Sequence, residues 1–146
     1  MPRIAISDEL VVGPPPENVE SIRRLADDGF QAILNLRPTN AASDFSSRDE
    51  GLAAVEQDLT YLCAPLPSEG LDDFSVRSVI TKLDLLPKPI FMHADQSSKA
   101  AVIGLIDSAV SKNWSVSETL KQADELGLET DDTPEIHEFV ERFVDA

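Results

Sequence analysis

The sequence predicts an α/β fold with a four- or five-stranded, mainly parallel sheet that is flanked by helices on both faces. Short apolar segments suited to buried strands, at residues 31–36, 61–66 and 90–92, alternate with longer amphipathic segments. Clusters of Pro, Gly and Asp separate the two kinds of segment. This alternation is typical of parallel sheets whose strands are joined by helices. The 146 residues suit a single domain, 1–146.

The chain is strongly acidic, with a formal net charge of -15 and a sequence pI near 4.3. Nucleic acids and anionic membranes carry the same sign of charge, so we expect neither as a partner, whereas a basic protein partner or a high-salt habitat fits. Apolar stretches are much shorter than a bilayer span, and the first residues show no apolar signal-peptide core. We therefore expect a cytoplasmic protein.

The first half of the chain is predicted to begin with one or two short edge strands between Ile4 and Val12. Pro16 then suits the first turn of a helix, which ends near Gly29 as a left-handed cap. A buried strand follows at residues 31–36, and 39–45 is a polar loop. Ser47 and Glu50 have the spacing of a capping box for a helix that runs to about residue 57.

In the second half, a strand at residues 61–66 precedes an amphipathic helix at 72–86, whose apolar positions include Phe74. The strand 90–92 leads into a polar loop, and a helix begins near Lys99 and continues to about Val110. Another helix starts at residue 115 or 117 and ends at residue 127, and Pro134 opens the last one. Cys63, the only cysteine, is predicted to be a buried structural thiol.

The segment from residue 90 to residue 101 reads as a buried strand, a short polar loop and a helix. A loop at a helix N-terminus presents unpaired backbone N–H groups and the positive end of the helix dipole, and both favour an anion. An ordinary strand-to-helix turn has part of this geometry as well. The residues alone therefore leave an anion site and a plain turn as alternatives.

Two features resemble a known family: Asn35-Leu36-Arg37-Pro38 at the end of a central strand, and a later strand that ends in His93. They are similar to the cysteine-dependent tyrosine and dual-specificity phosphatases. The resemblance is closest to a small bacterial phosphatase-like branch, whose members are also fused to β-lactamase-like hydrolases and NAD kinases. It covers roughly Ile6 to Val140, and the layout from Gly29 to Pro38 is the most specific part.

In that family the loop reads His-Cys, four or five residues, then Arg. The resemblance implies that the thiolate attacks phosphorus, that the arginine grips two phosphate oxygens, and that an acid from another loop protonates the leaving oxygen. Here Ala94 stands at the cysteine position, and Lys99 stands at the arginine position, or Ala100 with the longer spacing. The chemistry needs no metal and no organic cofactor.

The same resemblance implies a phosphate-binding set formed by the loop and one neighbouring strand end: His93, Asp95, Gln96, Ser97, Ser98, Lys99 and Arg37. For His93, orienting the loop through backbone hydrogen bonds and a satisfied histidine at the strand end stay open as alternatives. Asp95 adds a negative charge that weakens dianion binding. For Arg37 a structural salt bridge is slightly favoured over ligand binding. The general-acid loop corresponds to residues 65–70, where Glu69 is the only acid.

Three functions fit these residues. The first is a phosphatase-like protein that does not hydrolyse phosphate esters but binds a phosphorylated small molecule or phosphoprotein at the loop His93–Lys99. The second is a true phosphatase with a phosphocysteine mechanism, seen with its cysteine replaced by Ala94. The third is a structural or interaction domain with no ligand in the loop. Loss of the arginine together with the cysteine favours a natural pseudophosphatase over an introduced replacement.

Overall fold

The computed structural model describes residues 3–38, 45–67, 71–128 and 135–144. Its five-stranded sheet has the order β1-β2-β5-β3-β4. The strands are β1 (Ile4–Ser7), β2 (Leu10–Val12), β3 (Ala32–Asn35), β4 (Thr60–Cys63) and β5 (Ile90–His93). Every pairing is parallel except that of β1 with β2. The predicted fold class is therefore confirmed.

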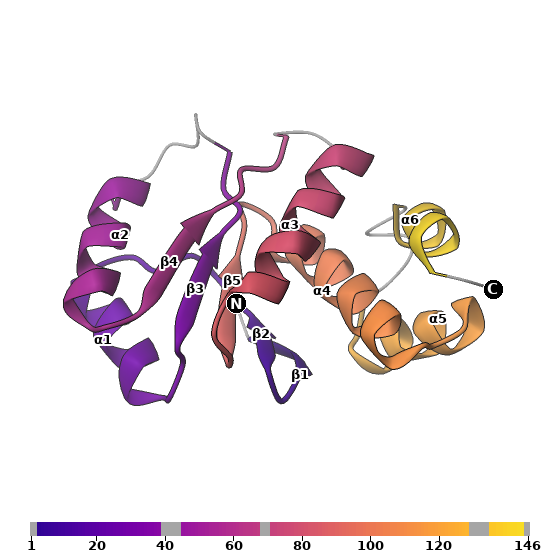
Figure 1. Ribbon diagram of the computed structural model, residues 1–146, viewed down its shortest axis with the longest axis horizontal. Helices are drawn as coiled ribbons and strands as arrows, with labels where there is room; N and C mark the ends of the chain where they lie inside the picture. Colours follow the sequence, from indigo (N-terminus) through magenta and orange to yellow (C-terminus); the bar gives the residue numbers. More distant parts are fainter. Residues whose placement is uncertain (1–2, 39–44, 68–70, 129–134, 145–146) are drawn as a thin grey trace.

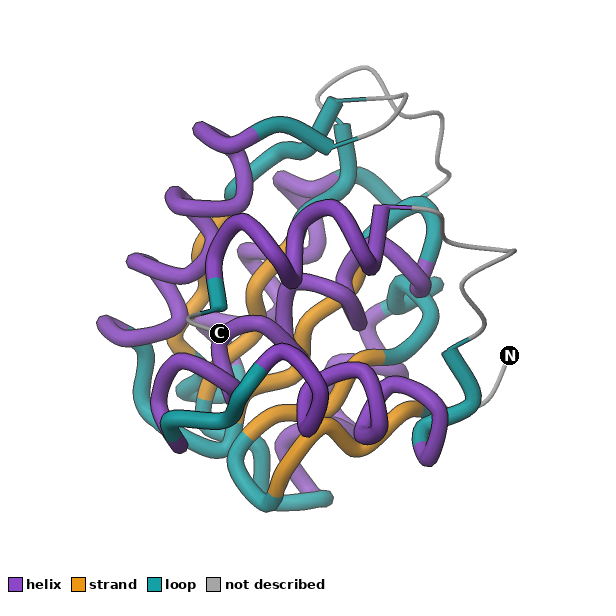
Figure 2. Tube along the Cα trace, turned by 90° about the vertical axis from the view of Figure 1, so that its right-hand side faces the viewer, coloured by secondary structure: helices purple, strands orange, loops and turns teal. Residues whose placement is uncertain are grey.

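Helices cover both faces of this sheet (Figures 1 and 2). They are α1 (Val19–Asp27), α2 (Ser47–Glu56), α3 (Asp73–Leu85), α4 (Ser97–Lys112), α5 (Val116–Glu125) and α6 (Glu135–Phe143). In Figure 1, α1 and α2 lie on one side of the sheet and α3 and α4 on the other, and α5 and α6 lie outside α4. Because β5 runs parallel to β2 and β3, the connection that leads from β5 to α4 lies at the carboxyl edge of the parallel strands.

Two hydrophobic cores arise because successive side chains of a strand point to opposite faces of the sheet. Along β3, Ala32 and Leu34 belong to the larger core, and Ile33 belongs to the smaller one. Along β5, Met92 joins the larger core and Phe91 the smaller one. All are at most 2% exposed. Burial of both faces explains why these strands appear in the sequence as continuous apolar runs.

The long central helix α4 is buried along most of its 16 residues, which is why its sequence is apolar nearly all round. Gly104 lets it approach the sheet closely, because a Cβ at this position would lie 3.0 Å from a Leu10 methyl and 3.2 Å from Ile6 Cγ1.

The ends of the shorter helix α1 are set by local capping residues. Asn18 caps its start through Ser21 N, and Gly29 follows its end with φ +97°, the predicted left-handed position.

Two predictions about burial are wrong. Cys63 is exposed, not buried, because β4 is an edge strand of the sheet. Phe74 does not contribute to the apolar face of α3, since its side chain is 82% exposed. The strand containing Cys63 also spans Thr60–Cys63 and does not continue to residue 66.

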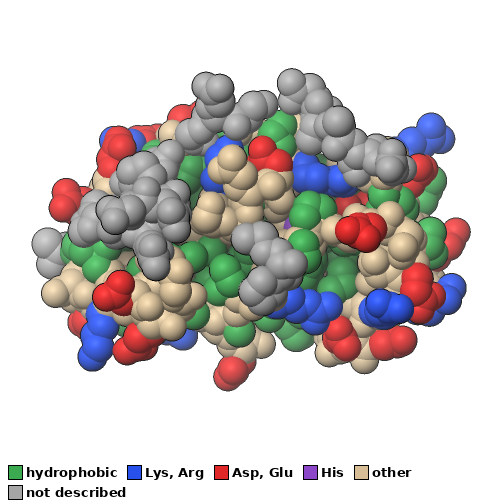
Figure 3. Space-filling model, turned by 180° about the vertical axis from the view of Figure 1, so that it is seen from behind, with side chains coloured by type: hydrophobic (Ala, Val, Ile, Leu, Met, Phe, Trp, Pro, Cys, Tyr) green, Lys and Arg blue, Asp and Glu red, His purple; other side chains and the backbone are tan. Residues whose placement is uncertain are grey.

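On the face shown in Figure 3, acidic and basic side chains are interspersed with apolar ones. Arginine residues that form exposed ion pairs with neighbouring acids include Arg3 with Asp28 and Arg23 with Glu20. In the described ranges, no helix is both long enough and apolar enough to pass through a bilayer.

Candidate functional site

The connection from β5 to α4 is shorter than predicted. His93 ends β5, and α4 already begins at Ser97, so that only residues 94–96 lie between them. Ala94 is fully buried in the larger core, whereas Asp95 and Gln96 are exposed. Ser97 and Lys99 are 4% and 6% exposed. The first turn of α4 is therefore largely buried, while the two residues before it are exposed.

The N-terminus of α4 has no side-chain cap. By contrast, α1, α2, α3 and α5 are capped by the side chains of Asn18, Ser46, Asp72 and Ser115. The first N–H groups of a helix have no partner within the helix, so this end of α4 keeps donors that an anion can use. The Asp95 carboxylate already takes the neighbouring donor, because Gln96 N lies 2.9 Å from Asp95 Oδ1.

Lys99 connects this loop to the segment that follows β4. Its Nζ donates a hydrogen bond to the carbonyl oxygen of Pro67 at 3.2 Å. The structure thus brings Lys99, the residue predicted at the family's arginine position, next to Pro67 in the segment predicted to carry the general acid. Glu69 lies outside the described residues, and its role as the acid stays a prediction.

Beneath the loop lies a buried ionic cluster formed by Arg37, Glu50 and His93. Glu50 Oε1 is 2.9 Å from Arg37 Nη2, and Glu50 Oε2 is 2.6 Å from His93 Nε2. The Glu50 and His93 side chains are 0% exposed and that of Arg37 is 6% exposed. Arg37 thus forms the structural salt bridge that the sequence slightly favoured.

Polar groups from the neighbouring strands complete the hydrogen bonds of this cluster. Asn35 Oδ1 accepts from Arg37 N at 2.9 Å and from Arg37 Nε at 3.3 Å, and Arg37 Nη1 donates to the carbonyl oxygen of Phe45 at 3.2 Å. Asn35 Nδ2 donates to Ser47 Oγ and to the Tyr61 hydroxyl, both at 2.8 Å. Burial, and next the Glu50 charge, raise the pKa of Tyr61, so this phenol stays neutral.

Of the two alternatives for His93, the contacts fit a histidine that is bonded at the strand end, because its Nε2 bonds to Glu50 and not to the loop backbone. A carboxylate accepts hydrogen bonds only, so Nε2 carries the hydrogen. Nδ1 is buried and has no hydrogen-bond partner among the residues that the structure describes. The side chain is therefore fixed from the Glu50 side.

Glu50 is the residue that the sequence interpretation missed. The expected capping box is wrong: Ser46, not Ser47, caps α2 by accepting from Asp49 N at 3.1 Å. This shift of one position turns Glu50 inward, where it meets Arg37 and His93. Its capping-box spacing explains Glu50 as an exposed residue, so the sequence gives no sign that Glu50 is a buried ion-pair partner. The only indication is Arg37, which needs an anionic partner where it is buried.

This fold is shared by solved phosphatase structures. TpbA from P. aeruginosa, solved with pTyr, matches over 95% of this chain and 82% of its own, with a TM-score of 0.71 at 17% identity. The catalytic core of the PP-IP phosphatase Siw14 from S. cerevisiae, with citrate, matches over 96% and 82% with a TM-score of 0.68 at 11% identity. A DUF442 protein from Shewanella putrefaciens covers 97% and 93% with a TM-score of 0.73 at 15% identity.

The chain has the fold of the cysteine-dependent phosphatases. No protein-family model and no curated protein matches the sequence. The resemblance assigns the cysteine position of the family pattern to Ala94, in the connection after β5, and the arginine position to Lys99, and both assignments stay predictions. A methyl group cannot attack phosphorus, and a lysine has a single ammonium group in place of the planar guanidinium fork.

Proposed function

We propose that this chain is a phosphatase-like domain that does not hydrolyse phosphate esters and instead binds a phosphorylated ligand, a small molecule or a phosphoprotein, at residues 94–99. The observation that carries the proposal is Ala94 in the loop between β5 and α4, on a phosphatase fold. Hydrolysis through a phosphocysteine needs a thiolate at this point, and the loop supplies none.

The start of α4 supports the binding half of the proposal. The helix begins without a side-chain cap, and the Ser97 and Ser98 N–H groups lie in its first turn. The hydroxyl groups of these two serines add donors at the same place. Lys99, one position further, provides a positive charge beside the loop. TpbA and Siw14 were solved with pTyr and with citrate, and both of these ligands are anions.

A second candidate function, an interaction domain with an empty loop, is favoured by two contacts. The Asp95 carboxylate occupies Gln96 N, and Lys99 Nζ is bonded to Pro67 O. In both contacts a donor of the loop is already bonded within the protein. Each contact therefore reduces the affinity of the loop for a dianion. This alternative predicts no phosphate binding, so the two candidates are separated by the same titration.

We expect Asp95→Asn to strengthen inorganic phosphate binding and Lys99→Ala to weaken it. Two unit charges about 4 Å apart in water interact by about 1 kcal/mol, which corresponds to about fivefold in affinity for each change. Calorimetric titration of both variants and of the unmodified chain, at constant ionic strength, measures the effect.

Lys121→Ala is the matched control for Lys99→Ala, because Lys121 is exposed on α5, far along the chain from the loop. It should leave phosphate affinity unchanged. Circular dichroism establishes that the Lys99 variant stays folded. Equal losses in both lysine variants would show that phosphate responds to net charge alone, and the loop would then not be the site.

A further inference from the structure

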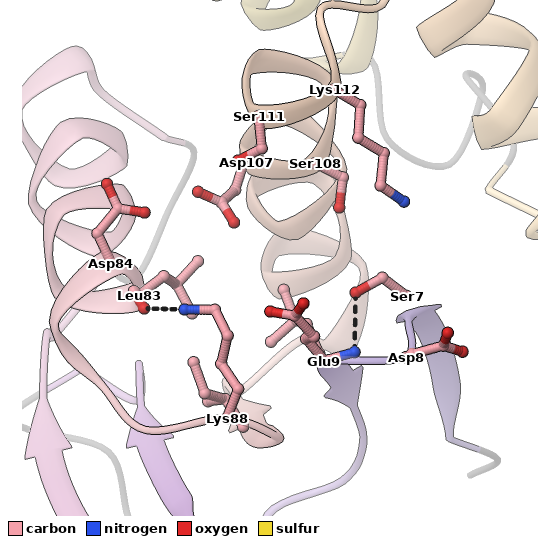
Figure 4. Close-up of a pocket in the computed structure, with 12 residues that line it drawn as sticks. Ser7, Asp8, Glu9, Leu83, Asp84, Lys88, Asp107, Ser108, Ser111 and Lys112 are labelled. Carbon is pink, nitrogen blue, oxygen red and sulfur yellow. Dashed lines mark hydrogen bonds between the residues drawn. The ribbon is translucent and has the colours of Figure 1, made fainter.

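The two edges of the sheet differ in how they are protected against pairing with other strands. An edge strand presents unpaired backbone N–H and C=O groups, and proteins commonly block such edges with charges, bulges or proline. At one edge, the pairing of β1 is irregular between Ala5 and Ser7. The strand leads into a turn with Asp8 and Glu9, beside the cavity shown in Figure 4, where Glu9 N bonds to Ser7 Oγ at 3.1 Å. A bulge and two charges therefore protect this edge.

At the other edge, β4 lacks such protection. Within the described parts of the chain, β4 pairs with another strand on one side only. The segment 59–64, which contains β4, has no charged residue, although the formal net charge of the chain is -15. The register of β4 with β3 has no shift from Thr60 to Cys63, and both of these residues are exposed. β4 is therefore a regular, neutral and accessible edge strand.

The backbone groups of Tyr61 and Cys63 point away from β3. In a parallel pair, alternate residues of a strand turn both their N–H and their C=O group toward the same neighbouring strand. Thr60 N and Ala64 N bond to carbonyl oxygens of the β3 segment at 3.0 and 2.9 Å, so the even-numbered residues of β4 face β3. Tyr61 and Cys63 consequently direct their N–H and C=O groups to the free side.

These outward groups match those of a second copy of the chain when the two β4 strands lie antiparallel. Residues that face each other in an antiparallel pair can exchange both hydrogen bonds, so Tyr61 of one copy would face Cys63 of the other. A two-fold axis then passes between the two Leu62 residues and generates the same pair again. Every outward N–H and C=O group of β4 finds a partner in this arrangement.

The residues that flank β4 disfavour the neighbouring registers. If Tyr61 faced Tyr61, then Cys63 would face Leu59, whose N–H is already bonded to Ala54 O at 2.9 Å. If Cys63 faced Cys63, then Tyr61 would face Pro65, which has no N–H group. Only the register in which Tyr61 faces Cys63 uses every outward group.

The side chains beside this edge also suit a second copy. The Tyr61 ring lies under α2, because a Cβ at Gly51 would be 3.1 Å from the ring. One turn further along α2, Val55 is 67% exposed, and Leu52 on the same helix is 56% exposed. Since the two-fold axis is perpendicular to the sheet, the α2 helices of both copies lie on the same face. Exposed apolar side chains thus accompany the neutral edge.

We propose that two copies of this chain associate through β4 into a symmetric dimer in which the two sheets become continuous. The paired edge is short, so we expect a weak dimer with a dissociation constant above about 1 μM. The two Cys63 residues do not face each other in this register, and the dimer needs no disulfide. Because both copies are acidic, added salt should strengthen the association by screening their repulsion.

The test is analytical ultracentrifugation of the full chain at concentrations up to about 1 mM, where the dimer should form. Cys63→Pro removes one outward N–H group from each copy and leaves the hydrogen bonds to β3 in place. It should raise the dissociation constant at least about tenfold. Cys63→Ser keeps this N–H group and is the matched control, for which we expect no change. Circular dichroism establishes that the proline variant stays folded.

Amide hydrogen exchange of the unmodified chain tests the same pairing without a substitution. The amides of Tyr61 and Cys63 should become protected as the protein concentration rises, whereas those of Thr60 and Leu62, which face β3, should be protected at every concentration. A chain that stays monomeric, or a dimer in which the Tyr61 and Cys63 amides stay unprotected, would overturn the proposal. So would equal association of Cys63→Pro and the unmodified chain, or a dimer that is lost in Cys63→Ser.

Discussion

Replacing Glu50 by alanine should lower the free energy of unfolding by about 3–5 kcal/mol, because it leaves the buried Arg37 guanidinium without its anionic partner. Glu50 also accepts from His93 Nε2, so the same change removes the partner of a second fully buried group. Small domains have a total stability of about 5–15 kcal/mol, so the loss is a large share of it. Urea denaturation followed by circular dichroism measures the change.

Glu56→Ala is the matched control, since Glu56 lies on the same helix but is exposed. We expect its effect to stay within about 0.5 kcal/mol. Glu50→Gln separates charge from shape, because it keeps the volume and one acceptor oxygen while removing the negative charge. If Glu50→Ala and Glu56→Ala cost the same, the buried cluster does not hold the carboxyl ends of β3 and β5 together.

The double change Ala94→Cys and Lys99→Arg should create hydrolysis of a small aryl phosphate, whereas the unmodified chain should show none. The cysteine supplies a thiolate beside the start of α4, and the arginine supplies the planar fork. We expect turnover above the protein-free blank for the double variant only, because the unmodified chain has no nucleophile at this position. Release of the phenol, followed by absorbance, measures the rate.

Lys99→Arg alone is the control for this gain, because it supplies the guanidinium fork but no nucleophile. It should stay inactive. Turnover by Lys99→Arg alone, or by the purified unmodified chain, would require another nucleophile and contradict the proposed loss of hydrolysis. A folded double variant with no turnover would mean that the loop around the buried Ala94 has closed to substrate.

Much of the fold could be predicted because its elements follow local rules. The continuous apolar runs of β3 and β5 reflect burial on both faces, and Gly29 ends α1 at a position that requires a positive φ. The cap at Asp72 likewise marks the start of α3. Each of these signals lies within a few residues of the element that it specifies.

The environment of Cys63 could not be predicted in this way. Its apolar neighbours suggest a core strand, but exposure depends on the place of β4 in the sheet. Strand order is a property of distant pairings, and β4 pairs on one side only, with β3. A short segment carries no information about which of its edges remains free.

The buried cluster was hidden from sequence reasoning for a related reason. Glu50 is 13 positions from Arg37 and 43 positions from His93, and a local pattern already offered an explanation for it as a capping residue. Similarly, Lys99 contacts Pro67, which is 32 positions away. The order of strand, connection and helix after Ile90 could be predicted from the residues, although α4 begins at Ser97 and not near Lys99. The partners that surround this connection come from other strands and helices, and no local pattern shows them.

The most direct test of the proposed function is a titration of the unmodified chain with inorganic phosphate, followed by amide NMR. The account predicts saturable shifts that are largest for the amides of Ser97 and Ser98, at the uncapped start of α4. It also predicts that these shifts grow in Asp95→Asn. Absence of saturable shifts between residues 94 and 99, or larger shifts elsewhere in the chain, would contradict a phosphate site in this loop.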